Sequence, residues 1–260
     1  MATYSLKKSY LLKNLKEVNF KDLWGGHGIF TTMWIFGKPA KILFFDNHIK
    51  NLIKSLKLYG IKKKFLKRDI LNVIDKNLSK EYHYNHLLRI ALTKKNISIS
   101  LRKRIPPKLD FNLRLVNLKR EKPRYKNLKY KKILSYLKKI DNSKSDIGLI
   151  YDKKILETGT SNLLFVKDKK VFSPKKNFYE GNTFKFFRTK LKRIIKKDIL
   201  LKDLKRFDEI ILVGSGKGVA SVKEIKELKW TRKKIDKFRI LSQYYRSAVK
   251  NCTNYKFLSQ

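Results

Sequence analysis

The sequence is short of cysteine. Cys252 is the only cysteine among 260 residues, so no disulfide can form within the chain and no cysteine-based zinc site is available. This usage is typical of a protein in a reducing cytoplasm, and we expect no metal centre. Hydrophobic residues make up 42% of the sequence and aromatic residues 12%. That is enough for the core of one large domain or two modest ones.

Long hydrophobic runs are also absent. No stretch approaches the roughly 18 apolar residues of a membrane-spanning helix. The first residues carry charges every few positions and lack the unbroken apolar segment of a secretory signal. The sequence therefore predicts a soluble cytoplasmic protein with no membrane partner.

Acidic residues are scarce, with 21 Asp and Glu against 65 Lys and Arg and a formal net charge of +44. Such an excess ordinarily suggests nucleic acid or an anionic membrane as a partner. Here the lysines are scattered through nearly every predicted element and form no basic tail or arm. The sequence is also rich in Ile and Asn, as an AT-biased coding sequence would give. We expect no specific nucleic-acid site, only salt-sensitive attraction to polyanions.

Prolines are few, and the pair Pro106-Pro107 marks the best candidate linker. Neither proline can donate a hydrogen bond to a sheet, and each disfavours helix at the residue before it. We predict a smaller α+β domain at residues 1–105 and a larger domain at residues 106–260.

Hydrophobic periodicity predicts alternating strands and helices in both domains. In the first domain we expect strands at 28–36 and 41–45, a helix from Asp46 to Gly60 capped by Asp46 or Asn47, a helix at 68–77, and two strands within 86–100. In the second domain we expect strands at 112–118, 147–151, 162–167, 170–173 and 207–213, a helix at 126–140, and a helix from Thr183 that includes Ile194 and Ile195.

The most informative stretch is 157–174, ETGTSNLLFVKDKKVFSP. It places a carboxylate before a small-residue turn, an amide, an apolar strand and a hairpin. Lys126 lies upstream in KPRYKNLKYKKIL, and the loop YEGNT follows downstream. Together these segments resemble the class IV aminotransferases, a family of pyridoxal-phosphate enzymes that includes branched-chain and D-amino-acid aminotransferases and aminodeoxychorismate lyase. The resemblance runs from about Trp24 to about Val222.

The resemblance implies a two-domain α+β fold of fold type IV, like that of D-amino-acid aminotransferase, with pyridoxal 5'-phosphate between the domains of a homodimer. It identifies Lys126 as the catalytic lysine whose amine forms the Schiff base with the cofactor. It identifies Glu157 as the carboxylate facing the pyridine nitrogen, which a nearby negative charge keeps protonated.

Two loops are expected to bind the phosphate. Gly181, Asn182 and Thr183 resemble the family's Gly-Ile-Thr element, with Asn182 in place of the usual aliphatic residue. This element opens a helix, where backbone N–H groups and the helix dipole favour an anion. Ser215 and Gly216 follow the strand FDEIILV, where the family often has a hydroxyl residue. One departure stands out, because Asn51 occupies the position of the arginine that clamps the phosphate in the family. An amide cannot supply that charged bidentate contact.

The choice of reaction depends on Phe30-Thr31-Thr32-Met33. This pattern resembles aminodeoxychorismate lyases, which release 4-aminobenzoate and pyruvate from 4-amino-4-deoxychorismate for folate synthesis. We expect Thr32 to lie near the substrate and Arg89 to contact a substrate carboxylate. A branched-chain or D-amino-acid aminotransferase stays open as an alternative, because two β-branched residues in a strand need no functional explanation. A second alternative is a non-catalytic basic scaffold that binds RNA or an acidic partner.

Overall fold

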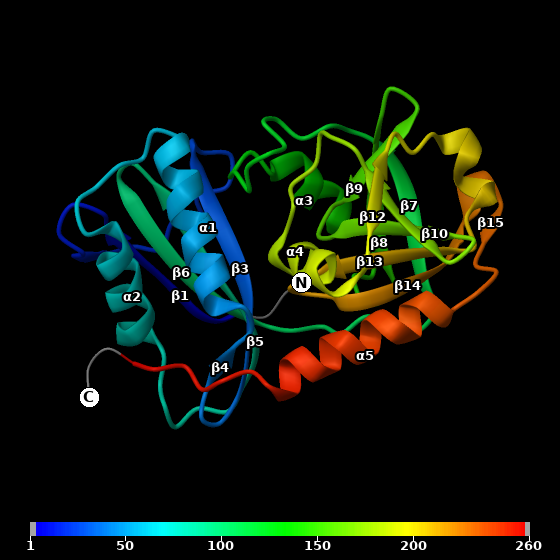
Figure 1. The fold of residues 1–260 in the computed structure, drawn as a ribbon. Coiled ribbons are helices and arrows are strands. Elements are labelled where there is room, and N and C mark those ends of the chain that lie inside the picture. Colours follow the sequence, from blue (N-terminus) through cyan, green and yellow to red (C-terminus); the bar gives the residue numbers. More distant parts are fainter. Residues whose placement is uncertain (1–3, 258–260) are drawn as a thin grey trace. The chain divides into compact units, whose positions relative to one another are not determined.

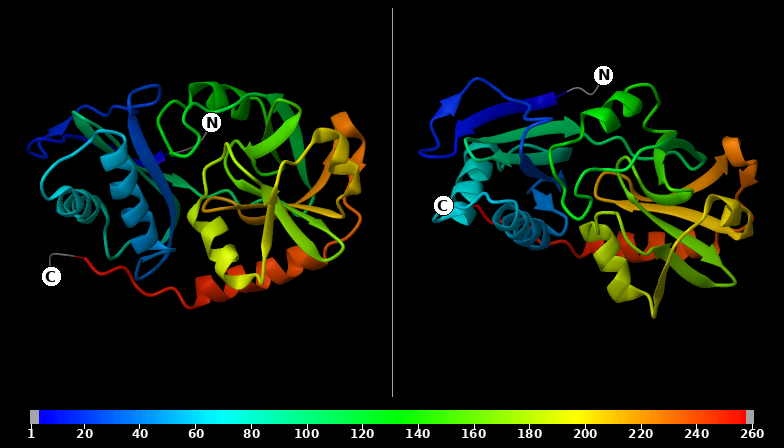
Figure 2. Two further views of the ribbon diagram at one scale, coloured as in Figure 1. Left: turned by 45° about the horizontal axis from the view of Figure 1, so that its top comes forward. Right: turned by 90° about the horizontal axis from the view of Figure 1, so that it is seen from above.

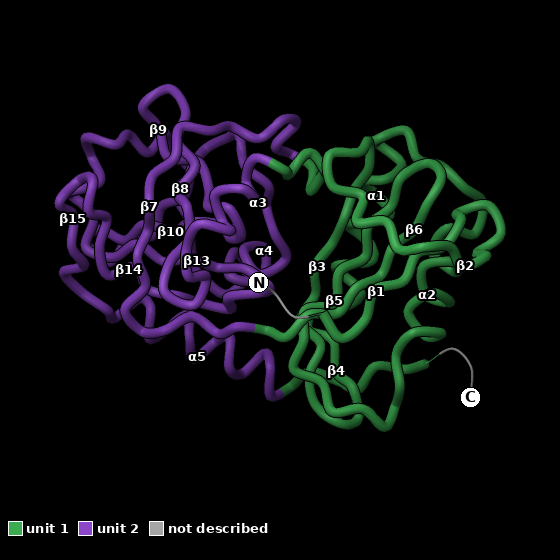
Figure 3. Tube along the Cα trace, turned by 180° about the vertical axis from the view of Figure 1, so that it is seen from behind, with its two compact units in different colours: residues 1–104, 125–131, 251–260 green, residues 105–124, 132–250 purple. Residues whose placement is uncertain are grey.

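The computed structural model describes residues 4–257, which divide into two units (Figure 3). Unit 1 contains the described residues of 1–104, 125–131 and 251–260. Unit 2 contains residues 105–124 and 132–250. The chain passes between the units next to the predicted linker, and again on either side of the segment that carries Lys126. That segment and the C-terminal segment both belong to unit 1.

Unit 1 is built on a six-stranded antiparallel sheet in the order β2-β1-β6-β5-β3-β4. Its strands are β1 (Tyr4–Leu11), β2 (Glu17–Val18), β3 (Gly28–Gly37), β4 (Lys41–Ile42), β5 (Tyr84–Thr93) and β6 (Asn96–Lys103). The helices α1 (Phe45–Leu58) and α2 (Leu66–Asn77) lie on the same face of this sheet (Figures 1 and 2). Alternate residues of β3 point to opposite faces, so Met33 and Ile35 enter the core under the helices.

The start of α1 differs from the expectation. The predicted strand at 41–45 shrinks to the two residues of β4, and the helix begins at Phe45. Phe44 takes a left-handed conformation with φ 56° and turns the chain directly into the helix without a side-chain cap. Asp46 therefore lies in the first turn rather than capping it, and it still suits the positive end of the helix dipole.

Unit 2 is built on a nine-stranded mixed sheet in the order β12-β11-β10-β13-β14-β7-β8-β9, with β15 paired to β14. Its strands are β7 (Phe111–Asn117), β8 (Ser145–Tyr151), β9 (Lys154–Thr158), β10 (Asn162–Lys167), β11 (Lys170–Pro174), β12 (Ile194–Lys197), β13 (Glu209–Gly214), β14 (Gly218–Ile225) and β15 (Trp230–Thr231). Its helices are α3 (Lys131–Leu137), α4 (Asn182–Lys190), α5 (Asp236–Lys250) and the 3-10 helices η1 (Leu201–Arg206) and η2 (Lys226–Leu228). The α+β class predicted from the sequence is confirmed.

Two predicted helices are shorter than expected. The helix at 126–140 reduces to α3, and the helix from Thr183 ends at Lys190. Ile194 and Ile195 instead enter β12, which pairs in parallel with β11. A pairing with a distant strand outweighs the local helical spacing. No helix described between residues 4 and 257 combines the length and apolar character needed to cross a membrane.

Candidate active site

Lys126 lies in an extended segment of unit 1, not at the start of a helix as predicted. The Phe30 N–H donates to the Lys126 carbonyl at 2.9 Å, and the Leu128 N–H donates to the Gly28 carbonyl at 2.9 Å. Leu128 is fully buried against Phe30 and Ala91. The segment thus pairs with β3 like an added strand, which fixes the backbone from which the lysine side chain extends.

Within unit 1 the Lys126 amine lies beside Phe30, whose ring contacts two further aromatic rings. The Lys126 Nζ atom lies 5.0 Å from the centroid of the Phe30 ring. Trp24 meets the same ring edge-on at 4.8 Å, and Tyr130 does so at 5.5 Å. These rings make a largely apolar wall beside the amine, of the kind that excludes water from a reacting group. Trp24 and Tyr130 were not assigned to the site from the sequence.

Arg89 projects from β5 on the face of the sheet opposite the helices. Its Nε donates to the Ser100 hydroxyl at 3.3 Å, its Nη2 pairs with Asp22, and its Cζ lies 4.4 Å from the centroid of the Trp24 ring. Its Nη1 atom is buried and has no hydrogen-bond partner among the described residues. A buried N–H donor without an acceptor is costly, so this nitrogen marks a place where an acceptor from a ligand would be stabilised.

Thr32 is the register partner of Arg89 on β3 and is half-buried. Its neighbour Thr31 points the other way, because successive strand residues alternate. A 2.7 Å hydrogen bond joins the Thr31 hydroxyl to Nδ1 of His48 on α1. Only one threonine of the pair therefore shares a face with Arg89. Asn51, at the position of the family arginine, is half-buried on α1.

Glu157 is the penultimate residue of β9 in unit 2 and is only 5% exposed. Arg120 holds it with a guanidinium fork, in which Nε donates to Oε1 at 2.7 Å and Nη2 donates to Oε2 at 3.2 Å. The same Nη2 also donates to the Pro123 carbonyl at 3.0 Å. Sequence reasoning missed Arg120, which no spacing distinguishes among 65 basic residues. A bidentate fork fixes both the charge and the orientation of the carboxylate.

The turn after Glu157 is fixed by a second carboxylate that was also missed. Asp146 is fully buried, and Oδ2 accepts the Thr158 hydroxyl at 2.9 Å. The Thr160 hydroxyl donates to the same oxygen. Gly159 leaves no room for a side chain, since an added Cβ would lie 2.8 Å from Ile147 Cγ1. The small residues of this turn therefore allow close packing beneath the site.

Asn162 connects the parts of the unit 2 site. Its side-chain oxygen accepts the Gly181 N–H at 3.0 Å, and its amide donates to the Tyr179 carbonyl. Asn162 is also the register partner of Val213, next to the β13–β14 turn that carries Ser215 and Gly216. The Tyr179 N–H in turn lies 3.4 Å from Glu157 Oε2. The carboxylate, the start of α4 and that turn therefore lie together in unit 2.

The start of α4 has features that suit an anion. Thr183 is 1% exposed, and its hydroxyl has no hydrogen-bond partner among the described residues. The first N–H groups of a helix have no partner within the helix, and its dipole is positive there. Asn182 is buried in the same turn. Nearby, burial raises the pKa of the Tyr179 hydroxyl to about 12, although the charge of Arg120 opposes the shift, so Tyr179 is neutral at physiological pH.

Comparison with known proteins places the chain in a family. Residues 28–225 match the profile described as amino-transferase class IV. The chain belongs to the class IV aminotransferase family. No curated protein matches the sequence.

Solved structures of aminotransferases share the fold. A branched-chain aminotransferase from Thermoproteus uzoniensis, solved with norvaline, has a TM-score of 0.78 at 14% identity over 96% of each chain. A branched-chain aminotransferase from Thermobaculum terrenum in its pyridoxal-phosphate form has a TM-score of 0.71 at 14% identity over 93% of each chain. A hypothetical aminotransferase from Mycobacterium tuberculosis in its pyridoxal-phosphate form has a TM-score of 0.66 at 13% identity, covering 94% of this chain and 99% of that one. At these identities the likeness is one of fold.

Pyridoxal phosphate is the cofactor of the class IV family, and the unit 2 site fits it. The Thr183 hydroxyl is buried at a helix N-terminus without a hydrogen-bond partner among the described residues, and a phosphate oxygen would satisfy it. The fixed carboxylate of Glu157 suits a protonated ring nitrogen. The described residues contain no group of three or more His, Cys, Asp or Glu side chains arranged to hold a metal ion.

Proposed function

We propose that this class IV family member is a pyridoxal-phosphate-dependent 4-amino-4-deoxychorismate lyase. In this proposal Lys126 binds the cofactor and carries the proton, and Glu157 faces the pyridine nitrogen. Asn182, Thr183, Ser215 and Gly216 bind the phosphate. When bound, the cofactor serves as the sink for electrons released at the amino-bearing carbon. The overall reaction needs no co-reactant, because the substrate divides into 4-aminobenzoate and pyruvate.

The observation that carries the choice of substrate is the surroundings of Arg89. Its buried Nη1 atom lacks a protein acceptor among the described residues, which suits a carboxylate of the substrate. Trp24 lies against the Arg89 guanidinium and against Phe30, which suits a planar, unsaturated ring. A branched-chain amino acid also carries a carboxylate that Arg89 could bind, so the choice between the two reactions rests on the aromatic surroundings of Arg89. These features favour the lyase over a branched-chain aminotransferase.

Each residue then has a defined task. The Lys126 amine takes the proton from the ring carbon that bears the amino group. The ether C–O bond breaks, the ring becomes aromatic, and the enol of pyruvate leaves and takes up a proton. Glu157, oriented by Arg120, keeps its charge directed at the cofactor nitrogen. Arg89 and Thr32 orient the substrate, and the aromatic wall excludes water from the amine.

Two alternatives make different predictions. As an aminotransferase, the protein would use the same Lys126 to shift a proton between an amino acid and a keto acid, and the lyase reaction would not occur. As a scaffold it would bind no cofactor. We also propose a homodimer, as the family resemblance implies, and light scattering would test it by giving twice the chain mass.

The decisive experiment mixes the purified protein and pyridoxal phosphate with 4-amino-4-deoxychorismate. We expect equimolar 4-aminobenzoate, followed by fluorescence, and pyruvate, followed with lactate dehydrogenase. Lys126→Ala should abolish both products and the absorbance of the bound cofactor. Arg89→Met should raise KM by roughly tenfold or more, the scale of a lost charged hydrogen bond, without removing that absorbance.

A matched control and the contrary outcomes complete the test. Arg104→Met also removes an arginine from unit 1, where Arg104 stacks on Trp34, and it should leave KM unchanged. Transamination between branched-chain amino acids and 2-oxoglutarate with no 4-aminobenzoate would overturn the lyase in favour of the aminotransferase. A protein that neither binds the cofactor nor turns over either substrate would support the scaffold.

A further inference from the structure

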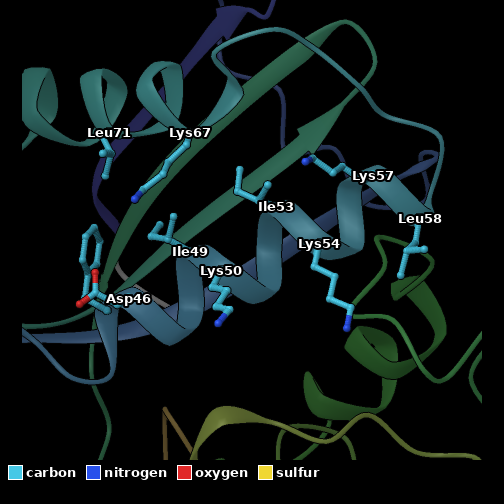
Figure 4. Close-up of a pocket in the computed structure, with 10 residues that line it drawn as sticks. Asp46, Ile49, Lys50, Ile53, Lys54, Lys57, Leu58, Lys67 and Leu71 are labelled. Carbon is cyan, nitrogen blue, oxygen red and sulfur yellow. The ribbon is translucent and has the colours of Figure 1, made fainter.

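Helices α1 and α2 of unit 1 border an open groove of about 710 Å³ (Figure 4). None of the residues assigned above to substrate or cofactor lines it. Its apolar floor includes Ile49, Ile53 and Leu71. Ile49 is buried, whereas the other two are half-buried. At one end Leu58 is 62% exposed. An apolar strip of this kind on a protein surface marks a site of contact.

Lysines surround this apolar floor. Lys50, Lys54 and Lys57 follow one another along α1 at helical spacing, and Figure 4 shows Lys67 of α2 pointing toward Ile49. Asp46 is the one carboxylate among the groove-lining residues. Within residues 4–257, none of the four lysines forms an ion pair. The groove therefore combines an apolar floor with positive charge that no ion pair among the described residues offsets.

We propose that this groove docks an acidic amphipathic helix of a partner protein. Apolar side chains at positions i, i+3, i+4 and i+7 of such a helix enter a groove of this kind. Its carboxylates at the same spacing then meet Lys50, Lys54 and Lys57, which extend over about 10 Å of α1. Charge complementarity of this kind speeds and directs association. The site is independent of the chemistry at Lys126.

Two other occupants fit the groove less well. The flat surface of an anionic bilayer would meet the lysines but could not reach Ile49 at the bottom of a concave floor. A second copy of this chain carries the same net charge of +44, and its helices would bring more lysines than carboxylates to the groove. A helix that is apolar on one face and acidic on its flanks satisfies both the floor and the lysines.

The test uses a fluorescein-labelled helical peptide of roughly 18 residues, made of Leu, Ala and Glu with leucines at i, i+3, i+4 and i+7. The full chain should bind this peptide, which fluorescence anisotropy measures. The affinity should fall as the sodium chloride concentration rises, because salt screens surface charges. A peptide of the same composition in scrambled order should bind at least about tenfold more weakly. Equal binding of both peptides would overturn the proposal, because net charge alone would then explain it.

Substitutions locate the binding. Lys54→Glu with Lys67→Glu should weaken binding about tenfold or more, and so should Ile53→Ser in the apolar floor. Lys94→Glu with Lys95→Glu, at the exposed β5–β6 turn of the same unit, makes the same change in net charge and should leave binding within about twofold. Circular dichroism verifies that each variant is folded. Equal losses of peptide affinity in the two double variants would refute docking in this groove. Displacement of the peptide from the wild-type chain by phosphatidylglycerol vesicles would refute it too.

Discussion

At the scale of single residues, the Arg120–Glu157 pair is the strongest constraint on the unit 2 site. Both side chains are nearly inaccessible, with 4% and 7% exposure. Removing one partner of a buried ion pair leaves an uncompensated charge, which costs about 3 to 5 kcal/mol. We therefore predict that Arg120→Met lowers the free energy of unfolding by about that amount, measured by urea denaturation. Arg206→Met, at an arginine with 71% side-chain exposure, should change it little.

The double variant Arg120→Met with Glu157→Leu should recover most of the lost stability, because neither charge is then left unpaired. If the double variant instead loses as much free energy of unfolding as the two single variants together, the pair is not coupled and Arg120 acts through its packing alone.

Replacing Thr183 should affect the stability of the protein and its affinity for the cofactor in opposite ways. Its buried hydroxyl lacks a protein partner among the described residues, so Thr183→Val should leave the stability of the cofactor-free protein unchanged or raise it by about 1 kcal/mol. In the proposed site the same change removes a donor to the phosphate, so it should weaken pyridoxal-phosphate binding by roughly tenfold. Thermal denaturation and a spectroscopic titration measure the two effects. Thr189→Val, at an exposed position of the same helix, is the control, and an equal loss of affinity there would contradict the phosphate assignment.

At the scale of elements, the sequence predicts strands well where alternation and turn residues coincide. The hairpin of β5 and β6 and the pair β10 and β11 lie where expected, because the Lys-Lys-Asn and Lys-Asp-Lys-Lys turns separate clear apolar runs. The start of α4 was also predicted, from Gly181 followed by an amphipathic run. In these places local propensity and tertiary pairing favour the same structure.

The errors arise where pairing with a distant segment decides the outcome. Ile194 fits the apolar face of α4 but pairs with Val171 of β11. Lys126 was expected in a helix, yet its segment pairs with β3. Helix α5 lies outside the segments interpreted from the sequence. At the site, the motif predicts roles for Glu157 and Thr183, and these stay predictions. Arg120 could not be found, because its contact with Glu157 joins positions 37 residues apart in the chain.

The pairing of the Lys126 segment with β3 can be tested at Gly28, where neighbouring atoms leave no room for a side chain. A Cβ added there would lie 2.1 Å from the Leu92 carbonyl and 2.6 Å from Leu128 Cδ1, so Gly28→Ala must displace backbone. We predict a loss of at least about 2 kcal/mol in the free energy of unfolding and weaker cofactor retention through the displaced lysine segment. Gly60→Ala meets no atom within 4 Å and carries only the strain of its φ of +78°, so it should cost about 1 kcal/mol. Unchanged stability and retention in Gly28→Ala would show that the segment is not held at this contact.

At the scale of the whole molecule, the net charge of +44 should attract nucleic acids whatever their base sequence. We predict that two DNA oligonucleotides of equal length and unrelated sequence bind equally well. Their affinity should fall by a factor on the order of a thousand between 50 and 200 mM salt if six or more phosphates are contacted. Fluorescence anisotropy at several salt concentrations measures this. A preference for one sequence that persists at physiological salt would instead support the RNA-binding scaffold.

The C-terminal segment completes the core of unit 1. The Tyr255 hydroxyl donates to Asp75 Oδ1 at 2.6 Å across 180 residues of sequence, and its ring packs edge-on against Phe45. During synthesis on the ribosome, α1 and α2 therefore emerge long before the tyrosine that covers them. At typical rates of translation the interval is on the order of ten to forty seconds. Throughout that interval the nascent chain presents an unfinished apolar surface to chaperones and proteases, so slow codons placed between α2 and Tyr255 would lower the yield of folded protein without changing a single amino acid.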